Sequence, residues 1–290
     1  MRYIFWLVTT DHLTDRIWFK DDEDFKAAMN IVAVLAATMD LRIVTFILMS
    51  NHVHFVLDCE REMADVFIVR FKKLYSQYYS NKYGSCELLR DNAVDIRPIA
   101  IGDESFERGV AYVLMNCVAA KICLHPSQYP WGTGNCFFNS NPEGGIRIGN
   151  LSGRGRMRIL RSRLPVPDNY ILNDLGFISP SSYVPVKFVE SVFKTAPRMT
   201  WYLNNSSKAK RLNASNEAPS FNDQLISAAI KDLLVSLFKS HDIRDLDDTQ
   251  KSELFRQIRF RFSSEPSQIA RVCGESYENV CKLLDTFSKV

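Results

Sequence analysis

Short apolar runs alternate with amphipathic stretches over the first 121 residues of the chain. The runs at 3–9, 42–49, 52–58 and 93–101 are rich in β-branched and aromatic residues, which predicts four strands. Between them, segments 22–35, 67–83 and 103–121 place apolar residues every three or four positions, which predicts helices. Asp21 or Asp22 stands where the first of these helices would be capped.

The order of these elements, βαββαβ and then a further helix, is that of a ferredoxin-like split βαβ antiparallel sheet. It predicts an α+β fold, with this sheet in a first domain at 1–136. We predict a basic irregular connecting region at 137–203 and a linker at 204–220, which is poor in apolar residues. Residues 221–290 are expected to form a smaller, mostly α-helical C-terminal domain.

The last part of the chain has the spacing of a helix-turn-helix. Pro266 to Gly274 would be its first helix and Tyr277 to Leu284 its second. Glu278 and Asp285 give the second helix little positive charge. These helices therefore either read DNA or form a packing or dimer-forming bundle.

Composition indicates the class of protein and the compartment in which it is expected. With 290 residues and 46% hydrophobic residues, the chain can bury real cores. Apolar runs such as Ile31 to Ala37 stop far short of the roughly 18 residues of a membrane span, and the first strand leads into Thr9-Thr10-Asp11 rather than a signal cleavage site. Seven cysteines without a Cys-x-x-Cys pair are typical of a reduced compartment. We expect a cytoplasmic protein with no membrane partner.

The most specific motif is Met49-Ser50-Asn51-His52-Val53-His54, at the start of the third predicted strand. Alternate residues of a strand share a face, so His52 and His54 point the same way. Two adjacent imidazoles can hold a metal ion and leave other coordination positions open. Alone, such a pair can also face water or bond to backbone, so a second element must support the interpretation.

That second element is the helix predicted at 103–121. Tyr112 and Asn116 are four residues apart and share one side of it. Either residue alone would be unremarkable, since the chain has eleven tyrosines. Their joint spacing with the histidine pair gives them weight.

Over roughly its first half, the chain resembles the single-tyrosine HUH transposases, and most closely their REP-associated branch. An apolar strand, Asn-His-x-His, an aromatic-rich basic helix and a Tyr-(three residues)-Asn-x-Val helix occur here in the family's order. The resemblance implies a ferredoxin-like fold, a homodimer, and Mg²⁺ or Mn²⁺ as cofactor. It implies Tyr112 as nucleophile, His52 and His54 as metal ligands, and Asn116 as the third ligand.

The chemistry of these groups fits that resemblance. A phenol has a pKa of about 10, so roughly one tyrosine in a thousand is ionised at neutral pH. A divalent cation can polarise a phosphodiester and fix it opposite the phenol oxygen. Imidazole ligands suit zinc whereas phosphate oxygens suit magnesium or manganese, and the resemblance favours the latter. We expect a single-stranded DNA endonuclease and strand transferase with a 5′-phosphotyrosine intermediate.

Two segments are predicted to hold DNA. The helix at 67–83 interleaves cations with tyrosines, which suits phosphates and unstacked bases, although its apolar stripe also predicts a core face. Residues 141–211 carry 12 Lys and Arg against 4 Asp and Glu, within a net charge of +3 for the chain. This band is either a phosphate-binding surface or a solvated basic face. The candidate DNA-binding residues are Arg70, Lys72, Lys73, Tyr75, Tyr79, Lys82, Arg154, Arg156 and Arg158.

Other functions use the same residues. A replication or mobilisation nickase would share the histidine pair and tyrosine but cut at one origin, whereas a transposase cuts both ends of an element. A catalytically inactive DNA-binding regulator would leave the four site residues unexplained, as would an RNA-binding protein. The expected partner is single-stranded DNA, with hairpin or element-end sequences.

Overall fold

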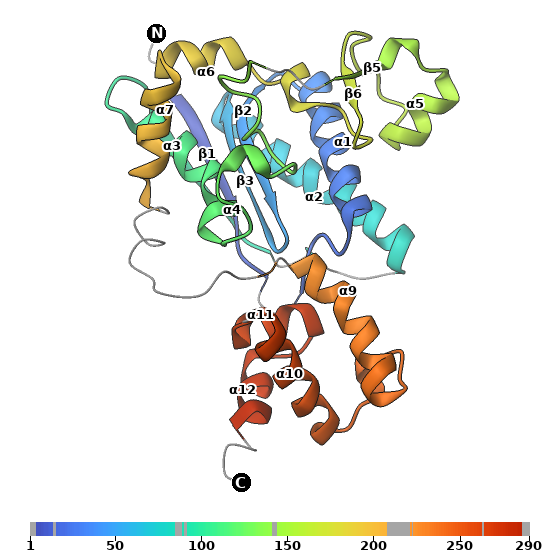
Figure 1. The fold of residues 1–290 in the computed structure, drawn as a ribbon. Helices are drawn as coiled ribbons and strands as arrows, with labels where there is room; N and C mark the ends of the chain where they lie inside the picture. The colour runs from blue at the N-terminus through green and yellow to red at the C-terminus, as the bar shows by residue number, and fades with distance from the viewer. Residues whose placement is uncertain are drawn as a thin grey trace.

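The computed structural model describes residues 4–13, 16–84, 89, 92–140, 144–207, 221, 223–262 and 264–285. Its central sheet contains β1 (Ile4–Thr10), β2 (Arg42–Met49), β3 (His52–Asp58) and β4 (Val94–Ala100) in the order β2-β3-β1-β4. All neighbouring strands are antiparallel. Helices α1 (Asp22–Thr38) and α2 (Arg61–Tyr83) form the two crossovers (Figure 1). The predicted ferredoxin-like α+β fold is confirmed.

The two faces of the sheet carry different helices. On β3, Phe55 packs against Phe67 and Phe71 of α2, with ring centroids 4.9 and 5.5 Å apart. Its neighbour His54 instead meets Tyr112 of α3 (Ser105–Leu114). Because successive strand residues point to opposite faces, α2 and α3 lie on opposite sides of the sheet. The histidine pair therefore belongs to the α3 face.

The helix expected at 103–121 is interrupted, so its predicted continuity is wrong. α3 ends at Leu114, and a separate turn α4 (Asn116–Ala119) follows Met115. The Asn116 amide nitrogen donates to the carbonyls of Tyr112 and Val113, at 2.9 and 3.1 Å. Such side-chain bonds compete with the backbone pattern of a helix, which explains an end at this point.

The outer edge of β2 is covered by residues 131–133. The Leu48 amide donates to the Trp131 carbonyl and the Thr133 amide to the Phe46 carbonyl, at 2.9 and 3.1 Å. Between them, Gly132 approaches so closely that a Cβ would lie 2.7 Å from the Phe46 oxygen. Only glycine fits there without a backbone shift.

Residues 137–203 form more structure than the predicted connecting region. The strands and helices of this region are β5 (Gly145–Arg147), α5 (Gly153–Leu160), β6 (Ile171–Asn173), α6 (Val186–Phe193) and α7 (Ala196–Asn204), the last of which ends one residue beyond it. Short 3₁₀ turns lie at Ile148–Asn150 and Pro180–Ser182, and a further one at Pro126–Gln128 precedes the region. Phe177, Val189 and Phe193 are buried in the core of the sheet domain. α5 packs against α1, and α7 against α3. The core of the first domain thus extends well past residue 136.

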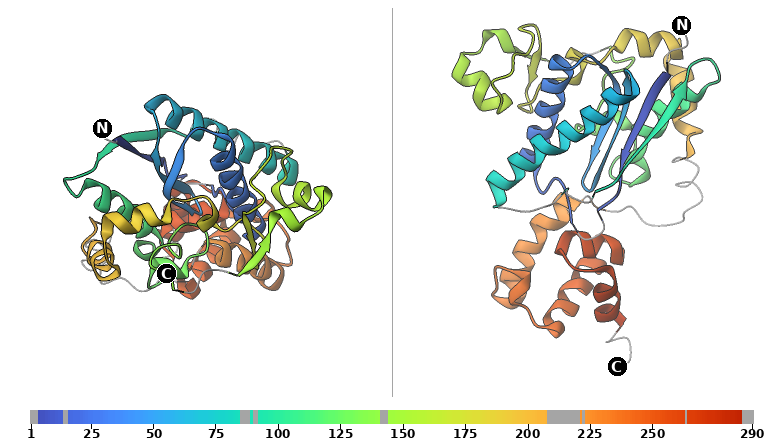
Figure 2. Two further views of the ribbon diagram at one scale, coloured as in Figure 1. Left: turned by 90° about the horizontal axis from the view of Figure 1, so that it is seen from above. Right: turned by 180° about the vertical axis from the view of Figure 1, so that it is seen from behind.

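The C-terminal helices enclose a second core, which contains Ile226, Phe255, Ile258, Ile269 and Val280. They are α9 (Asp223–Leu233), a π-helical turn (Leu234–Phe238), a 3₁₀ turn (Ile243–Asp245), α10 (Asp248–Phe262), α11 (Pro266–Cys273) and α12 (Tyr277–Asp285). α11 and α12 join through Gly274 at φ +69°, as in a helix-turn-helix. Figure 2 shows these helices at one end of the sheet. Most of the predicted linker, 208–220, lies outside the described residues.

No helix within the described ranges has both the length and the apolar character needed to cross a membrane.

Candidate active site

The histidine pair lies at the beginning of β3, directly after the turn at Ser50 and Asn51. His52 is 5% exposed and His54 fully buried, and their ring centroids are 4.8 Å apart. As the period-two pattern predicts, both rings lie on one face of the sheet. A rigid strand in the middle of a packed sheet holds them in place.

Asn51 fixes the protonation pattern of His52. The Asn51 amide nitrogen donates to the Leu13 carbonyl at 3.0 Å, so its oxygen is the atom 2.8 Å from His52 Nδ1. A carbonyl oxygen can only accept, and therefore Nδ1 carries the proton. The lone pair of the neutral ring is then on Nε2, the nitrogen available to a metal. The sequence motif contains Asn51 but does not indicate this role.

His54 is oriented by the neighbouring strand. Its Nδ1 lies 3.0 Å from the Thr9 hydroxyl, and Thr9 is the residue opposite His54 in the β1–β3 register. The Tyr112 ring stands edge-on to His54, with centroids 5.4 Å apart and planes at 83°. Tyr112 is only partly buried, so a substrate can reach it. Three of the four predicted site residues therefore meet at one point.

His12 is a further histidine at this site that the sequence analysis missed. It lies just beyond β1, is exposed, and stacks on His52 with ring centroids 3.7 Å apart and planes at 12°. The β1–β3 register of the folded sheet explains its place, because extension of the Thr9–His54 pairing brings the residues after Thr10 beside His52. His12 forms the solvent side of the site.

Asn116 is close to Tyr112 in the fold but its described contacts are with helix backbone. The side chain is buried, and its amide nitrogen donates hydrogen bonds to the Tyr112 and Val113 carbonyls. Asn116 therefore ends α3 and fixes the helix turn from which Tyr112 projects. Its assignment as third metal ligand stays a prediction.

The donor set fits a divalent cation that takes most of its ligands from elsewhere. Two neutral imidazoles offer nitrogen lone pairs, while water or a phosphate could fill the other positions. In the part of the chain that the structure describes, no three His, Cys, Asp or Glu side chains form a metal cluster.

The candidate DNA-binding tyrosines of α2 belong to the core. Tyr75 is fully buried with its hydroxyl bonded to the Trp18 carbonyl, and Tyr79 is 4% exposed. Burial raises the pKa of Tyr75 well above its ordinary value. A base cannot stack on either ring in this conformation. Of the two faces that the sequence predicted for this helix, these residues occupy the core face.

The lysines of α2 differ in exposure. Lys82 bonds to Asp21 and Asp24 at 2.7 Å each; burial works to lower its pKa, but these bonds raise it. Lys72 donates to the Asn92 carbonyl, and burial lowers its pKa to about 8 although Asp11 opposes this. Arg70 and Lys73 are exposed. They lie on the helix that covers the face opposite the histidine pair.

The candidate DNA-binding arginines of the basic band lie on helix α5. Arg156 is held by Asp168 at 2.7 Å and by the Gly149 carbonyl at 2.9 Å, which makes it a structural residue. Arg154 and Arg158 are exposed. α5 packs on α1 at the end of the sheet away from α9–α12 (Figure 1). The structure does not bring it beside His52.

Comparison with known proteins gives one structural likeness. No family model and no curated protein matches the chain. A solved structure described as the REP-associated tyrosine transposase bound to a REP hairpin aligns with 47% of this chain and 79% of that chain, at 16% identity and a TM-score of 0.35.

Proposed function

We propose that this protein is a metal-dependent enzyme that cuts and rejoins single-stranded DNA through a covalent bond to Tyr112, as a transposase does. The observation that carries the proposal is the convergence of Tyr112, from α3, with His52 and His54, from β3. Both imidazoles are held through Nδ1, which suits metal ligation through Nε2. A partly exposed phenol beside them suits a nucleophile.

In the proposed reaction, the Tyr112 oxygen attacks the scissile phosphorus. A new P–O bond forms to the tyrosine and the bond to the 3′ oxygen breaks. The phenol loses its proton and the leaving oxygen gains one, which releases a 3′ hydroxyl. A bound Mg²⁺ or Mn²⁺, with His52 and His54 as its protein ligands, would polarise the phosphate. Attack by another 3′ hydroxyl reverses the chemistry and joins a new strand without a nucleotide triphosphate.

The test is covalent capture of DNA. The protein is incubated with 3′-labelled single-stranded DNA from the flanks of its own gene, with Mn²⁺ or EDTA, and resolved on a denaturing gel. We expect a metal-dependent labelled protein band that is lost in Tyr112→Phe. Tyr277→Phe is the matched control, since Tyr277 is 54% exposed on distant α12. A band that persists in Tyr112→Phe would refute the assignment.

A further inference from the structure

One buried carboxylate joins the C-terminal helices to the turn that precedes the histidine pair. Asp223, at the start of α9, is 3% exposed. It accepts two hydrogen bonds from Arg271 of α11, at 2.7 and 3.0 Å, and one from Gln268 at 3.0 Å. It also accepts a hydrogen bond from the Ser50 hydroxyl, across the boundary between the two cores.

The other side of this contact leads to His52 within two residues. Ser50 is followed by Asn51, whose side-chain oxygen fixes the His52 tautomer. The same turn is held by the loop after β1, through the Trp18 amide on the Ser50 carbonyl at 2.7 Å and the Leu13 amide on the Asn51 carbonyl at 3.0 Å. Asp223 is the anchor that this turn receives from the helical domain.

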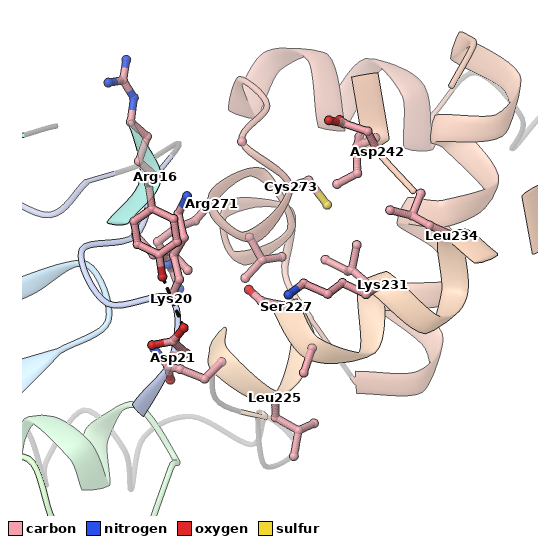
Figure 3. Close-up of a pocket in the computed structure, with 18 of the residues that line it drawn as sticks. Arg16, Lys20, Asp21, Leu225, Ser227, Lys231, Leu234, Asp242, Arg271 and Cys273 are labelled. Atoms are coloured by element: carbon pink, nitrogen blue, oxygen red, sulfur yellow. Dashed lines mark hydrogen bonds between the residues drawn. The ribbon is translucent and has the colours of Figure 1, made fainter. Parts of the chain in front are cut away.

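Beside Asp223, the Gln224 side-chain nitrogen donates to the Phe19 carbonyl at 2.8 Å, and next to these two contacts a cleft of about 1270 Å³ lies between the domains. Figure 3 shows its two walls, with Arg16, Lys20 and Asp21 on the sheet domain and Leu225, Ser227 and Lys231 on α9. Arg271 extends from α11 between them. The Asp223 junction lies beside this cleft, and its partner Arg271 is one of the residues that line it.

We infer that Asp223 is a positioning residue that couples the helix-turn-helix to the histidine pair. The inference rests on the proposed function only in taking His52 as a metal ligand. Arg271, Asp223, Ser50 and Asn51 form a continuous path from α11 to His52. A charged pair in a buried setting holds a defined geometry, and loss of the carboxylate leaves Arg271 without its anion. The Ser50 turn then keeps its bonds to the loop after β1 but loses its contact with Asp223, and His52 is held less firmly.

The experiment compares three single variants of the full chain and the double variant that combines Asp223→Asn with Ser50→Ala. Asp223→Asn removes the charge of the carboxylate. Ser50→Ala removes only the hydroxyl that donates to this carboxylate. Asp232→Asn is the matched control, because it makes the same chemical change at an exposed position of the same helix. Two quantities are measured: Mn²⁺ affinity by calorimetry, and the tautomer of the His52 ring by long-range ¹H–¹⁵N correlation spectra.

We expect Asp223→Asn and Ser50→Ala each to weaken Mn²⁺ binding about tenfold, the lower end of the range for groups that support a metal ligand. The His52 signal should change from one tautomer to a mixture, and Asp232→Asn should behave as wild type. The double variant should be no weaker than the weaker single, since both act along one path.

Unchanged Mn²⁺ affinity and an unchanged His52 tautomer in folded Ser50→Ala would overturn the inference. Ser50→Ala keeps the Asp223–Arg271 pair, so this outcome remains available even if Asp223→Asn does not fold. Neither readout needs DNA cleavage. If the wild-type protein forms no covalent adduct with DNA, the proposed function is refuted. The coupling between Asp223 and His52 can still be measured through Mn²⁺ affinity and the His52 tautomer.

Discussion

Asp24 shows how much of this structure can depend on one side chain. It is fully buried in the first turn of α1 and accepts hydrogen bonds from the Lys20 amide, the hydroxyls of Tyr78 and Tyr83, and Lys82, at 2.7 to 2.9 Å. We expect Asp24→Ala to lower the free energy of unfolding by about 3–5 kcal/mol, because the Lys20 amide, two tyrosine hydroxyls and Lys82 all lose this acceptor. Urea denaturation measures this. Exposed Asp22→Ala, the control, should cost less than about 1 kcal/mol, and equal losses would contradict the argument.

The burial of Lys72 predicts how the stability of the protein changes with pH. Burial lowers its pKa in the folded protein to about 8, below the roughly 10.4 of an unfolded chain. Between these values the unfolded state binds more protons, so this residue makes the protein more stable as the pH rises from 8 towards 10. We expect the difference in urea midpoint between wild type and Lys72→Met to shift in favour of wild type over that range. A constant difference would show that Lys72 keeps its ordinary pKa.

At the scale of elements, the strands were readable because each is short, apolar and β-branched. β2 and β3 begin and end where the pattern places them, and Asp21 is the cap of α1.

The end of α3 could not be predicted from the sequence, because it depends on how the Asn116 side chain turns back on its own helix. The places of Thr9 and His12 were not readable either, since they follow from a register between distant strands. The α2 tyrosines show the same limit: alternating cations and rings predict contact with DNA or with a core, and only packing decides.

Gly274 offers a test of the turn between α11 and α12. Its φ of +69° is strained for other residues, while a Cβ there would meet nothing within 4 Å. We therefore expect Gly274→Ala to destabilise the helical domain by about 1 kcal/mol through the backbone alone. Gly153, at the first position of α5, is open as well and has no positive φ. Gly153→Ala should be neutral or slightly stabilising in the same thermal melt, and equal effects of the two would refute the argument.

At the scale of the whole molecule, the exposed arginines of α5 do not lie beside the proposed active site. If single-stranded DNA crosses α5, Arg154→Ala with Arg158→Ala should reduce the slope of log K against log salt by about 1.4, or roughly 0.7 for each phosphate contact. Binding measured by anisotropy at several salt concentrations tests this. Lys187→Ala on α6, also exposed, is the control. A slope equal to that of wild type would make the arginines a solvated surface.

The strip at 131–133 along β2 limits how two copies could associate. Strand-to-strand joining of two sheets needs a free row of backbone groups, and this strip already occupies those of Phe46 and Leu48. The opposite margin, β4, contains Pro98, which has no amide hydrogen, and an Arg97–Asp95 ion pair. We therefore expect that the homodimer predicted from the sequence, if it forms, is not a continuous eight-stranded sheet and is built through helices or loops.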